Sequence, residues 1–205
     1  VGLLPHYMER PHSSLVYMVR HWMQMSGQTE ELFYLYNLED LKTKLEEVLG
    51  QGKPVLLIGI SFALLDFAEQ YAISNSNLTI IETGGMKGRR KEVPKSELIY
   101  RLQGSYPKSR IISEYGMCEL LSQAYSDETM IFSTPPWMKV LISDVNDPLT
   151  LSYQGTGVAN IIDLANIDSC AFIQTQDLIR LEDTKFQILG RVDHSDIRGC
   201  SLLYS

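Results

Sequence analysis

The first part of the chain alternates between two spacings of apolar residues. Helical spacing follows Ser13 and Ser14, which can cap a helix, and it recurs over residues 38–49 until Gly50 stops it. The continuous apolar run over residues 55–60 is typical of a strand that is buried on both faces. The pattern predicts further helices over 61–71 and 97–102, and further strands over 78–81 and 110–113. Strands that alternate with helices predict a parallel sheet with crossover helices.

The pattern changes after Asp127. A helix is predicted just before this point, over residues 119–125. Strand-like segments then follow one another between Asp-Pro, Gly-Thr-Gly and Glu-Asp-Thr turn signals, over residues 138–143, 158–163, 172–181 and 185–189. We therefore expect an α/β fold in which a parallel-sheet subdomain (1–127) is followed by a small, mostly antiparallel sheet or barrel (128–205).

Composition narrows the class of protein. Of the 205 residues, 44% are hydrophobic and 21% are charged, which is ordinary for a globular protein with a proper core. The net charge of −7 argues against a nucleic-acid partner, which would need a basic surface. The single basic run, residues 87–91, suits a solvated loop or, as the alternative, local anion binding.

Three cysteines, Cys118, Cys170 and Cys200, are too few and too widely spaced for a disulfide framework or a zinc site, which favours a reducing, cytoplasmic location. Apolar runs such as residues 54–60 fall far short of the ~20 residues that span a bilayer. The first five residues lack the charged and apolar regions of a signal peptide. Because the sequence starts at Val1 rather than Met, we expect it to be part of a longer protein.

Two loops follow predicted strands at the end where open α/β sheets bind ligands, over residues 82–88 and 114–119. Gly84 and Gly85 let the backbone approach a flat base closely, although a plain tight turn is the alternative. The spacing of these glycines is not that of a dinucleotide fingerprint.

The second loop carries an aromatic residue and a carboxylate. Tyr115 offers a ring for stacking, Gly116 leaves room beside it, and Glu119 suits Mg²⁺, which prefers one or two carboxylates plus substrate phosphates. The alternative is that Tyr115 lies at the edge of the core and that Glu119 complements a helix dipole.

A polar break interrupts the strand-like stretch around Asp177. A carboxylate at such a break can accept hydrogen bonds from ribose hydroxyls, although a turn-forming Asp is the commoner case. Arg191, between Gly190 and Asp193, can reach the same sugar or a phosphate; a surface ion pair is the alternative.

Four motifs, taken in order, resemble the adenylate-forming superfamily of acyl-CoA synthetases, luciferases and peptide-synthetase adenylation domains. They are Thr83-Gly84-Gly85, Tyr115-Gly116-Met117-Cys118-Glu119, Thr175-x-Asp177-Leu178 and Gly190-Arg191-x-Asp193. Within the superfamily the sequence is most similar to the acyl-protein synthetase of bacterial bioluminescence and its acyltransferase relatives. That likeness is carried by residues 82–89, 114–123 and 189–191, with Arg198-Gly199-Cys200.

The resemblance implies a partial adenylate-forming fold and ATP- and Mg²⁺-dependent activation of a carboxylic acid, in particular a fatty acid, to an acyl-adenylate. The acyl group would then pass to a thiol. The implied nucleotide-binding residues are Gly84, Gly85, Tyr115, Gly116, Met117, Cys118, Asp177 and Arg191, with Glu119 as the metal ligand and catalytic residue. In this pattern the glycines and Tyr115 flank adenine, Asp177 holds the ribose hydroxyls, and Arg191 lies on the ribose or phosphate side.

Three departures from the family pattern matter. Cys118 stands where the superfamily usually has Thr, so a hydroxyl contact is replaced by a weak thiol one. The phosphate loop lies outside these residues, and no full lid domain follows Asp193. We therefore expect the 205 residues alone to be inactive or nearly so, because nothing in them holds the β- and γ-phosphates.

Cys200 is the position that best matches the cysteine that carries the acyl group in the bioluminescence enzymes. Arg198 would favour its thiolate. A buried packing role for Cys200 and a competing role for Cys170 stay open.

Two alternative functions also stay open. The first is an acyl- or aryl-CoA ligase similar to phenylacetate-CoA ligase, with coenzyme A as acceptor. The second is a non-catalytic nucleotide-binding module that docks a partner such as a reductase.

Overall fold

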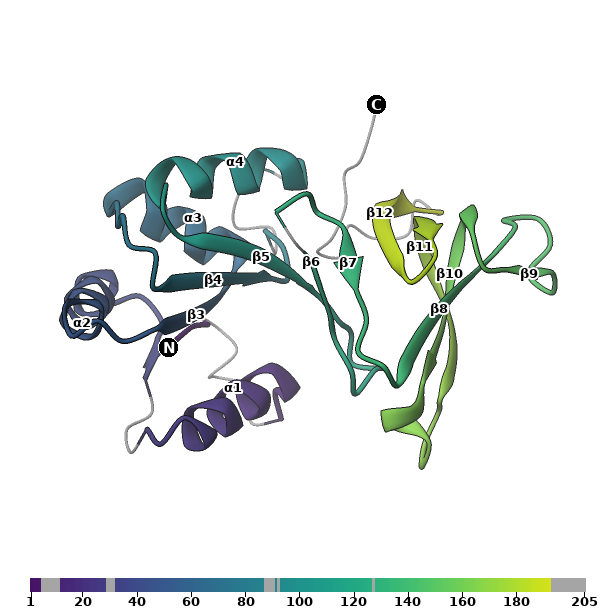
Figure 1. Cartoon of the computed structure of the whole chain (residues 1–205), viewed down its shortest axis with the longest axis horizontal. Helices are drawn as coiled ribbons and strands as arrows, with labels where there is room; N and C mark the ends of the chain where they lie inside the picture. The colour runs from purple at the N-terminus through teal and green to yellow at the C-terminus, as the bar shows by residue number, and fades with distance from the viewer. Residues whose placement is uncertain (5–11, 29–31, 87–90, 92, 127, 193–205) are drawn as a thin grey trace. The chain divides into compact units, whose positions relative to one another are not determined.

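The structure is a computed structural model that describes residues 1–4, 12–28, 32–86, 91, 93–126 and 128–192 (Figure 1). The chain divides into two compact units, Val1–Ile112 and Ser113–Ser205. The change of pattern in the sequence lies somewhat later, at Asp127. None of the helices in the described part is both long enough and apolar enough to cross a membrane.

The first unit is built around a parallel sheet with the strand order β2-β1-β3-β4. Its elements are β1 (Gly2–Leu3), α1 (Ser14–Met25), β2 (Phe33–Tyr34), α2 (Leu38–Gly50), β3 (Val55–Ile60), α3 (Ser61–Gln70), β4 (Leu78–Thr83), α4 (Lys95–Ser105) and the first half of β5 (Arg110–Tyr115). The prediction of a parallel sheet with intervening helices is confirmed.

Local sequence explains where these helices begin and what they bury. The Ser13 hydroxyl accepts a hydrogen bond from Val16 N at 3.2 Å and so caps α1, as the sequence predicted. Helix α3 packs against α4 on one face of the sheet (Figure 1). The rings of Phe67 and Tyr106 stack in this helical layer with centroids 6.3 Å apart.

The second unit is an antiparallel sheet with the strand order β5-β6-β7-β12-β11-β10-β8-β9, joined to a short helix η1. Its further elements are β6 (Ala124–Ser126), β7 (Phe132–Ser133), β8 (Met138–Ser143), β9 (Leu151–Ser152), β10 (Gly155–Asp163), η1 (Leu164–Asn166), β11 (Phe172–Glu182) and β12 (Lys185–Arg191). The α/β fold class, with a parallel part followed by a mostly antiparallel one, is therefore confirmed.

Three aromatic rings lie at the centre of the core of this unit. Phe186 is 5.3 Å from both Tyr115 and Phe132 between ring centroids, and the two phenylalanines stack at an interplanar angle of 20°. Aliphatic side chains surround them; the core includes Leu120, Met138, Val140, Ile142, Ile161, Ile179 and Leu181. Burial of these groups is the main driving force for folding this unit.

The predicted helix over residues 119–125 is wrong. Residues 117–120 form a turn closed by Leu120 N on Met117 O at 3.1 Å, and strand β6 begins at Ala124. The amides of Leu121 and Ser122 donate to the carboxylate of Asp163. The turn is thus held by a contact 41 residues away in sequence.

Candidate functional site

Strand β11 is irregular where Asp177 lies. Five residues of β11, from Gln174 to Leu178, lie opposite three of β10, from Val158 to Asn160, so two extra residues bulge from the ladder. The hydroxyl of Thr175 fills the break, because it donates to Ala159 O at 3.0 Å and accepts from Asp177 N at 3.0 Å. The polar break that the sequence predicted here is therefore a β-bulge that Thr175 stabilises.

Asp177 connects two other residues that the sequence singled out. The Tyr115 hydroxyl donates to Oδ2 of Asp177 at 2.7 Å, and Nε of Arg191 lies 3.5 Å from Oδ1. Arg191 stands directly opposite Asp177 in the ladder between β11 and β12. Residues from three parts of the sequence thus meet around one carboxylate.

The guanidinium of Arg191 is held at a second point. Its Nη2 donates to Oε1 of Gln176 at 3.0 Å, and the backbone continues the pairing through Val192 N on Gln176 O at 2.9 Å. Within the part that the structure describes, Nε of Arg191 is buried and makes no hydrogen bond despite its nearness to Asp177. A donor of this kind beside a carboxylate suits a polar ligand group.

Tyr115 contributes its hydroxyl to this arrangement more than its ring. The side chain is only 4% exposed, and its ring makes edge contacts with Phe132 and Phe186. The ring therefore occupies the core position that was the alternative to base stacking, and the hydroxyl makes a contact with Asp177 that the sequence did not predict.

The turn after Tyr115 presents the remaining residues of the motif. Cys118, a free thiol, and Glu119 are exposed, and Met117 packs against the aromatic core. An added Cβ at Gly116 would lie 2.4 Å from Oε1 of Glu114, so a larger residue here would displace the end of that side chain. The Glu119 carboxylate is therefore accessible to a cation on an exposed turn.

A buried carboxylate that the sequence did not reveal holds this turn in place. Asp163, 0% exposed, accepts hydrogen bonds from Leu121 N at 3.0 Å, Ser122 N at 2.9 Å and Ser122 Oγ at 2.6 Å through its two oxygens. Burial raises the pKa of Asp163, but these hydrogen bonds and one from Ala165 N outweigh it and hold the pKa below its ordinary value. The carboxylate is therefore charged and fully used in positioning the backbone.

Two neighbours extend this support. The indole N–H of Trp137 donates to Ser122 Oγ at 2.9 Å. Asn166 Nδ2 donates to Glu119 O at 2.8 Å and to Cys170 O at 2.9 Å, so it ties the turn to the segment before β11. The one signal in the sequence was local: Asp163 followed by Leu-Ala-Asn is typical of an N-cap of a short helix.

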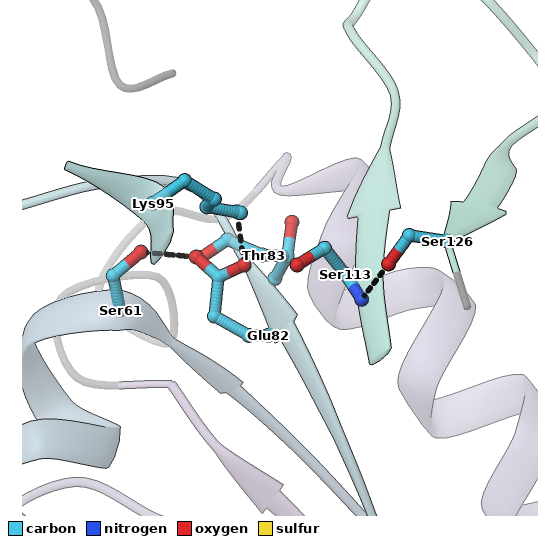
Figure 2. A network of polar contacts seen from close by, with 6 residues as sticks. All are labelled: Ser61, Glu82, Thr83, Lys95, Ser113 and Ser126. Carbon is cyan, nitrogen blue, oxygen red and sulfur yellow. Dashed lines mark hydrogen bonds and ion pairs between the residues drawn. The ribbon is translucent and has the colours of Figure 1, made fainter. Parts of the chain in front are cut away.

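Gly84 and Gly85 lie in the first unit, directly after β4. Gly84 has φ +70°, a left-handed conformation that favours glycine, and Gly85 is buried. The preceding Glu82, in the same motif, is 0% exposed; Ser61 Oγ and Lys95 Nζ donate to its two carboxylate oxygens (Figure 2). A charged, buried network therefore lies at the base of the double-glycine segment.

Several predicted residues lie outside the described residues: Cys200, Arg198, Gly199, Asp193 and most of the basic run 87–91. The competing Cys170 is an exposed free thiol whose Sγ lies 3.4 Å from Phe172 O.

The residues that are present fit parts of Mg-ATP. Asp177 offers carboxylate oxygens beside the unbonded Nε of Arg191, which suits hydroxyl and anionic groups of a nucleotide. Among the described residues no three His, Cys, Asp or Glu side chains gather to form a metal site. Glu119 alone is compatible with Mg²⁺, because this ion keeps several waters and takes further ligands from substrate phosphates.

No protein-family model matches the sequence, and no curated protein matches it. Solved structures do match the fold. Coronafacic acid ligase from Pectobacterium brasiliense, as its R395G mutant, matches 93% of this chain with a TM-score of 0.63 and 17% identity. ATP-bound MatB from Rhodopseudomonas palustris matches 93% with a TM-score of 0.62 and 11% identity. O-succinylbenzoate coenzyme A synthetase from Bacillus subtilis, in complex with AMP, matches 78% with a TM-score of 0.53 and 14% identity.

This chain spans about two fifths of the length of these proteins, since it covers 39%, 40% and 35% of them. At these identities the likeness establishes the fold. The expected α/β fold, with a parallel part followed by a mostly antiparallel one, is thus confirmed as a fold shared with an acid ligase and a coenzyme A synthetase. The adenylate-forming activity that the four motifs imply stays a prediction.

Proposed function

We propose that the protein to which this chain belongs uses ATP and Mg²⁺ to activate a carboxylic acid as an acyl-adenylate, and that this chain contributes the nucleoside side of the site. The observation that supports the proposal is the meeting of Tyr115, Asp177 and Arg191 around one carboxylate. The resemblance assigned these three residues to one nucleotide before any contact between them was known.

In this proposal each residue has a defined task. Asp177 accepts hydrogen bonds from the ribose hydroxyls, and Tyr115 fixes its orientation through Oδ2. Arg191 lies on the ribose or phosphate side, where Gln176 orients its guanidinium. By resemblance Gly84, Gly85 and Gly116 flank adenine together with Tyr115. Met117 and Cys118 are further nucleotide-binding residues, and Glu119 would hold Mg²⁺.

The reaction needs charge neutralisation and positioning more than acid–base chemistry. A carboxylate oxygen of the acid attacks the α-phosphorus of ATP, and the bond to the β-phosphate breaks as pyrophosphate leaves. A thiol then attacks the acyl carbonyl, and AMP leaves. Glu119, through its exposed carboxylate, would hold Mg²⁺, and the ion would supply positive charge that offsets the charge of the phosphates.

We further propose a fatty acid as substrate and a protein thiol as acceptor, with Cys200 as the first candidate. Two other outcomes remain in view. Coenzyme A as acceptor is supported by the fold shared with a coenzyme A synthetase. A non-catalytic nucleotide-binding module is supported by Cys118, which replaces the usual threonine.

The test is ATP–pyrophosphate exchange by the longest natural form of the protein, with a panel of fatty and aryl carboxylates. We expect exchange with wild type, and a loss of about 100-fold in Glu119→Ala, typical of removing one electrostatic contact to the transition state. Asp177→Asn should raise the KM for ATP, whereas Glu182→Gln, an exposed change on the same strand, should have no effect.

The acceptor is identified in a second assay with labelled fatty acid and ATP. Label that stays on the protein as a thioester and disappears in Cys200→Ser supports the acyl-protein route. Label released on coenzyme A supports the ligase. Absence of exchange with every carboxylate, together with measurable ATP binding, contradicts the enzymatic proposal and favours the binding module.

A further inference from the structure

The polar network at the carboxyl end of the parallel sheet has no role in the function proposed above. Its centre is Glu82, a carboxylate that is 0% exposed on β4. Ser61, the first residue of α3, and Lys95, the first residue of α4, donate to its two oxygens from opposite sides (Figure 2). The network therefore joins three elements that begin or end at one edge of the sheet.

The strand register explains why these residues meet. Adjacent parallel strands β3 and β4 pair Gly59 with Glu82 and Ile60 with Thr83, so Ser61 follows directly at the level where β4 ends. The Ser61 hydroxyl also lies 3.4 Å from Thr83 O, the carbonyl that precedes Gly84. Serine thus contacts both the buried carboxylate and the backbone that leads into the double glycine.

Lys95 closes the segment from its other end. The ion pair between Lys95 and Glu82 joins the residues on either side of the connection from β4 to α4, which contains Gly84 and Gly85. Both ends of that connection are consequently fixed to one carboxylate.

Stability does not explain this arrangement. A buried ion pair contributes little net stability, because desolvation offsets the attraction, and an apolar pair of similar volume is often as stable or more so. The hydrogen bonds do specify direction, however, since they define where Thr83 O and the first residue of α4 lie. Such a network is expected where a loop must hold one geometry.

We propose that Ser61, Glu82 and Lys95 are positioning residues for the Gly84-Gly85 segment and thereby set the affinity of the protein for an adenine nucleotide. The inference rests on the proposed function, in which that segment forms the adenine side. None of the three residues needs to touch the nucleotide.

The test compares AMP affinity with thermal stability in the longest natural form of the protein. The main variant is Glu82→Leu combined with Lys95→Met, which removes both charges and leaves neither buried alone. We expect AMP affinity to fall at least tenfold while the melting temperature stays within about 4 °C of wild type. Lys95→Arg retains the ion pair, and its Kd for AMP should lie within about threefold of the wild-type value. A tenfold change in Kd corresponds to about 1.4 kcal/mol of binding free energy.

A matched control is available on the same helix. Glu97 and Arg101 form an exposed ion pair on α4, so Glu97→Gln with Arg101→Met removes an equal pair of charges away from the network. This control should leave AMP affinity unchanged. If the main variant does not fold, the AMP affinity of Ser61→Ala is the test, because this variant retains the ion pair and removes only the contacts to Glu82 and Thr83. Reduced affinity supports the positioning role, and wild-type affinity contradicts it.

Asp177→Asn separates failure of the inference from failure of the proposed function. If wild type binds AMP and Asp177→Asn weakens it, while the network variants bind as wild type does, the positioning role is overturned and the nucleotide site stands. If wild type does not bind AMP, or Asp177→Asn binds equally well, the nucleotide site itself is refuted and the inference is refuted with it.

Discussion

Among the residues that the structure describes, each unit buries one carboxylate, and the two are satisfied in different ways. Glu82, in the parallel unit, is neutralised by an ammonium group and a hydroxyl. Asp163, in the antiparallel unit, receives four hydrogen bonds from backbone amides and a hydroxyl, all from uncharged donors. Both side chains are 0% exposed.

The difference shows what each carboxylate organises. Glu82 links the starts of two helices to the end of a strand through side chains, so its contacts can be exchanged for an apolar pair. Asp163 links to the backbone of a turn, and no other side chain of similar size offers acceptors in the same places. We therefore expect the protein to tolerate the joint replacement of Glu82 and Lys95 by apolar residues. We expect it to tolerate no single or paired replacement of Asp163 equally well.

The largest effect is expected where one charge is left buried alone. Lys95→Met removes the counter-charge of Glu82 and should lower the free energy of unfolding by about 3 kcal/mol or more, as when one partner of a buried pair is removed. Chemical denaturation measures this change. Adding Glu82→Leu should restore most of the loss, and a double variant as unstable as the single one would contradict the exchangeable character of this site.

Asp163→Ala should lower the free energy of unfolding somewhat less than Lys95→Met does. We expect no second substitution to restore the loss. It leaves the amides of Leu121 and Ser122 without their acceptor, and unsatisfied buried donors cost about 1–3 kcal/mol each, with partial relief from water. We expect a loss of about 2–3 kcal/mol in urea unfolding. A change below the error of the measurement would show that the turn does not depend on this carboxylate.

The pH dependence of the free energy of unfolding should distinguish wild type from Asp163→Asn. Because the folded pKa of Asp163 lies below its ordinary value of 3.8, its contribution is present above that value. The contribution is lost as the pH falls below about 4 and through the folded pKa. Wild type should therefore lose more stability than Asp163→Asn between pH 6 and pH 3, measured by urea midpoints; parallel curves would contradict this.

The smallest effect is expected for the exposed pair on α4. Glu97→Gln removes an ion pair with Arg101 whose side chains are 41% and 47% exposed. Exposed pairs of this spacing contribute about 0.3–0.5 kcal/mol and are screened by salt. The change in unfolding free energy should be near the limit of detection and should vanish in 1 M NaCl, in contrast to Lys95→Met.

Sequence patterns predicted most of the fold because the relevant forces are local. Ser13 caps α1 through its own neighbours, and the uninterrupted apolar run of β3 needs only burial. The bulge of β11 was visible as a polar break, since Thr175 and Asp177 bond within two residues of one another. These features require no knowledge of distant residues.

The turn after Tyr115 could not be predicted in this way. Leu120, Leu121 and Ala124 have a spacing that a helix also allows, and the acceptor that holds the observed turn is Asp163, far along the chain. The Glu82 network was missed for the same reason, because Ser61 and Lys95 lie 21 and 13 residues from it. Sequence motifs identified candidate ligands of a nucleotide but not the residues that hold the motifs in place.

The bulge in β11 has a consequence for which changes of length the protein can accept. Its two extra residues preserve the alternation of the strand, so Ile173, Thr175, Asp177 and Ile179 share one face, as their burial indicates. Insertion or loss of one residue here would reverse this parity and turn the Asp177 carboxylate away from Tyr115 and Arg191. We therefore expect this part of β11 to accept insertions or deletions of two residues but not of one. Substitutions at the exposed positions Phe172 and Gln174 do not change the alternation.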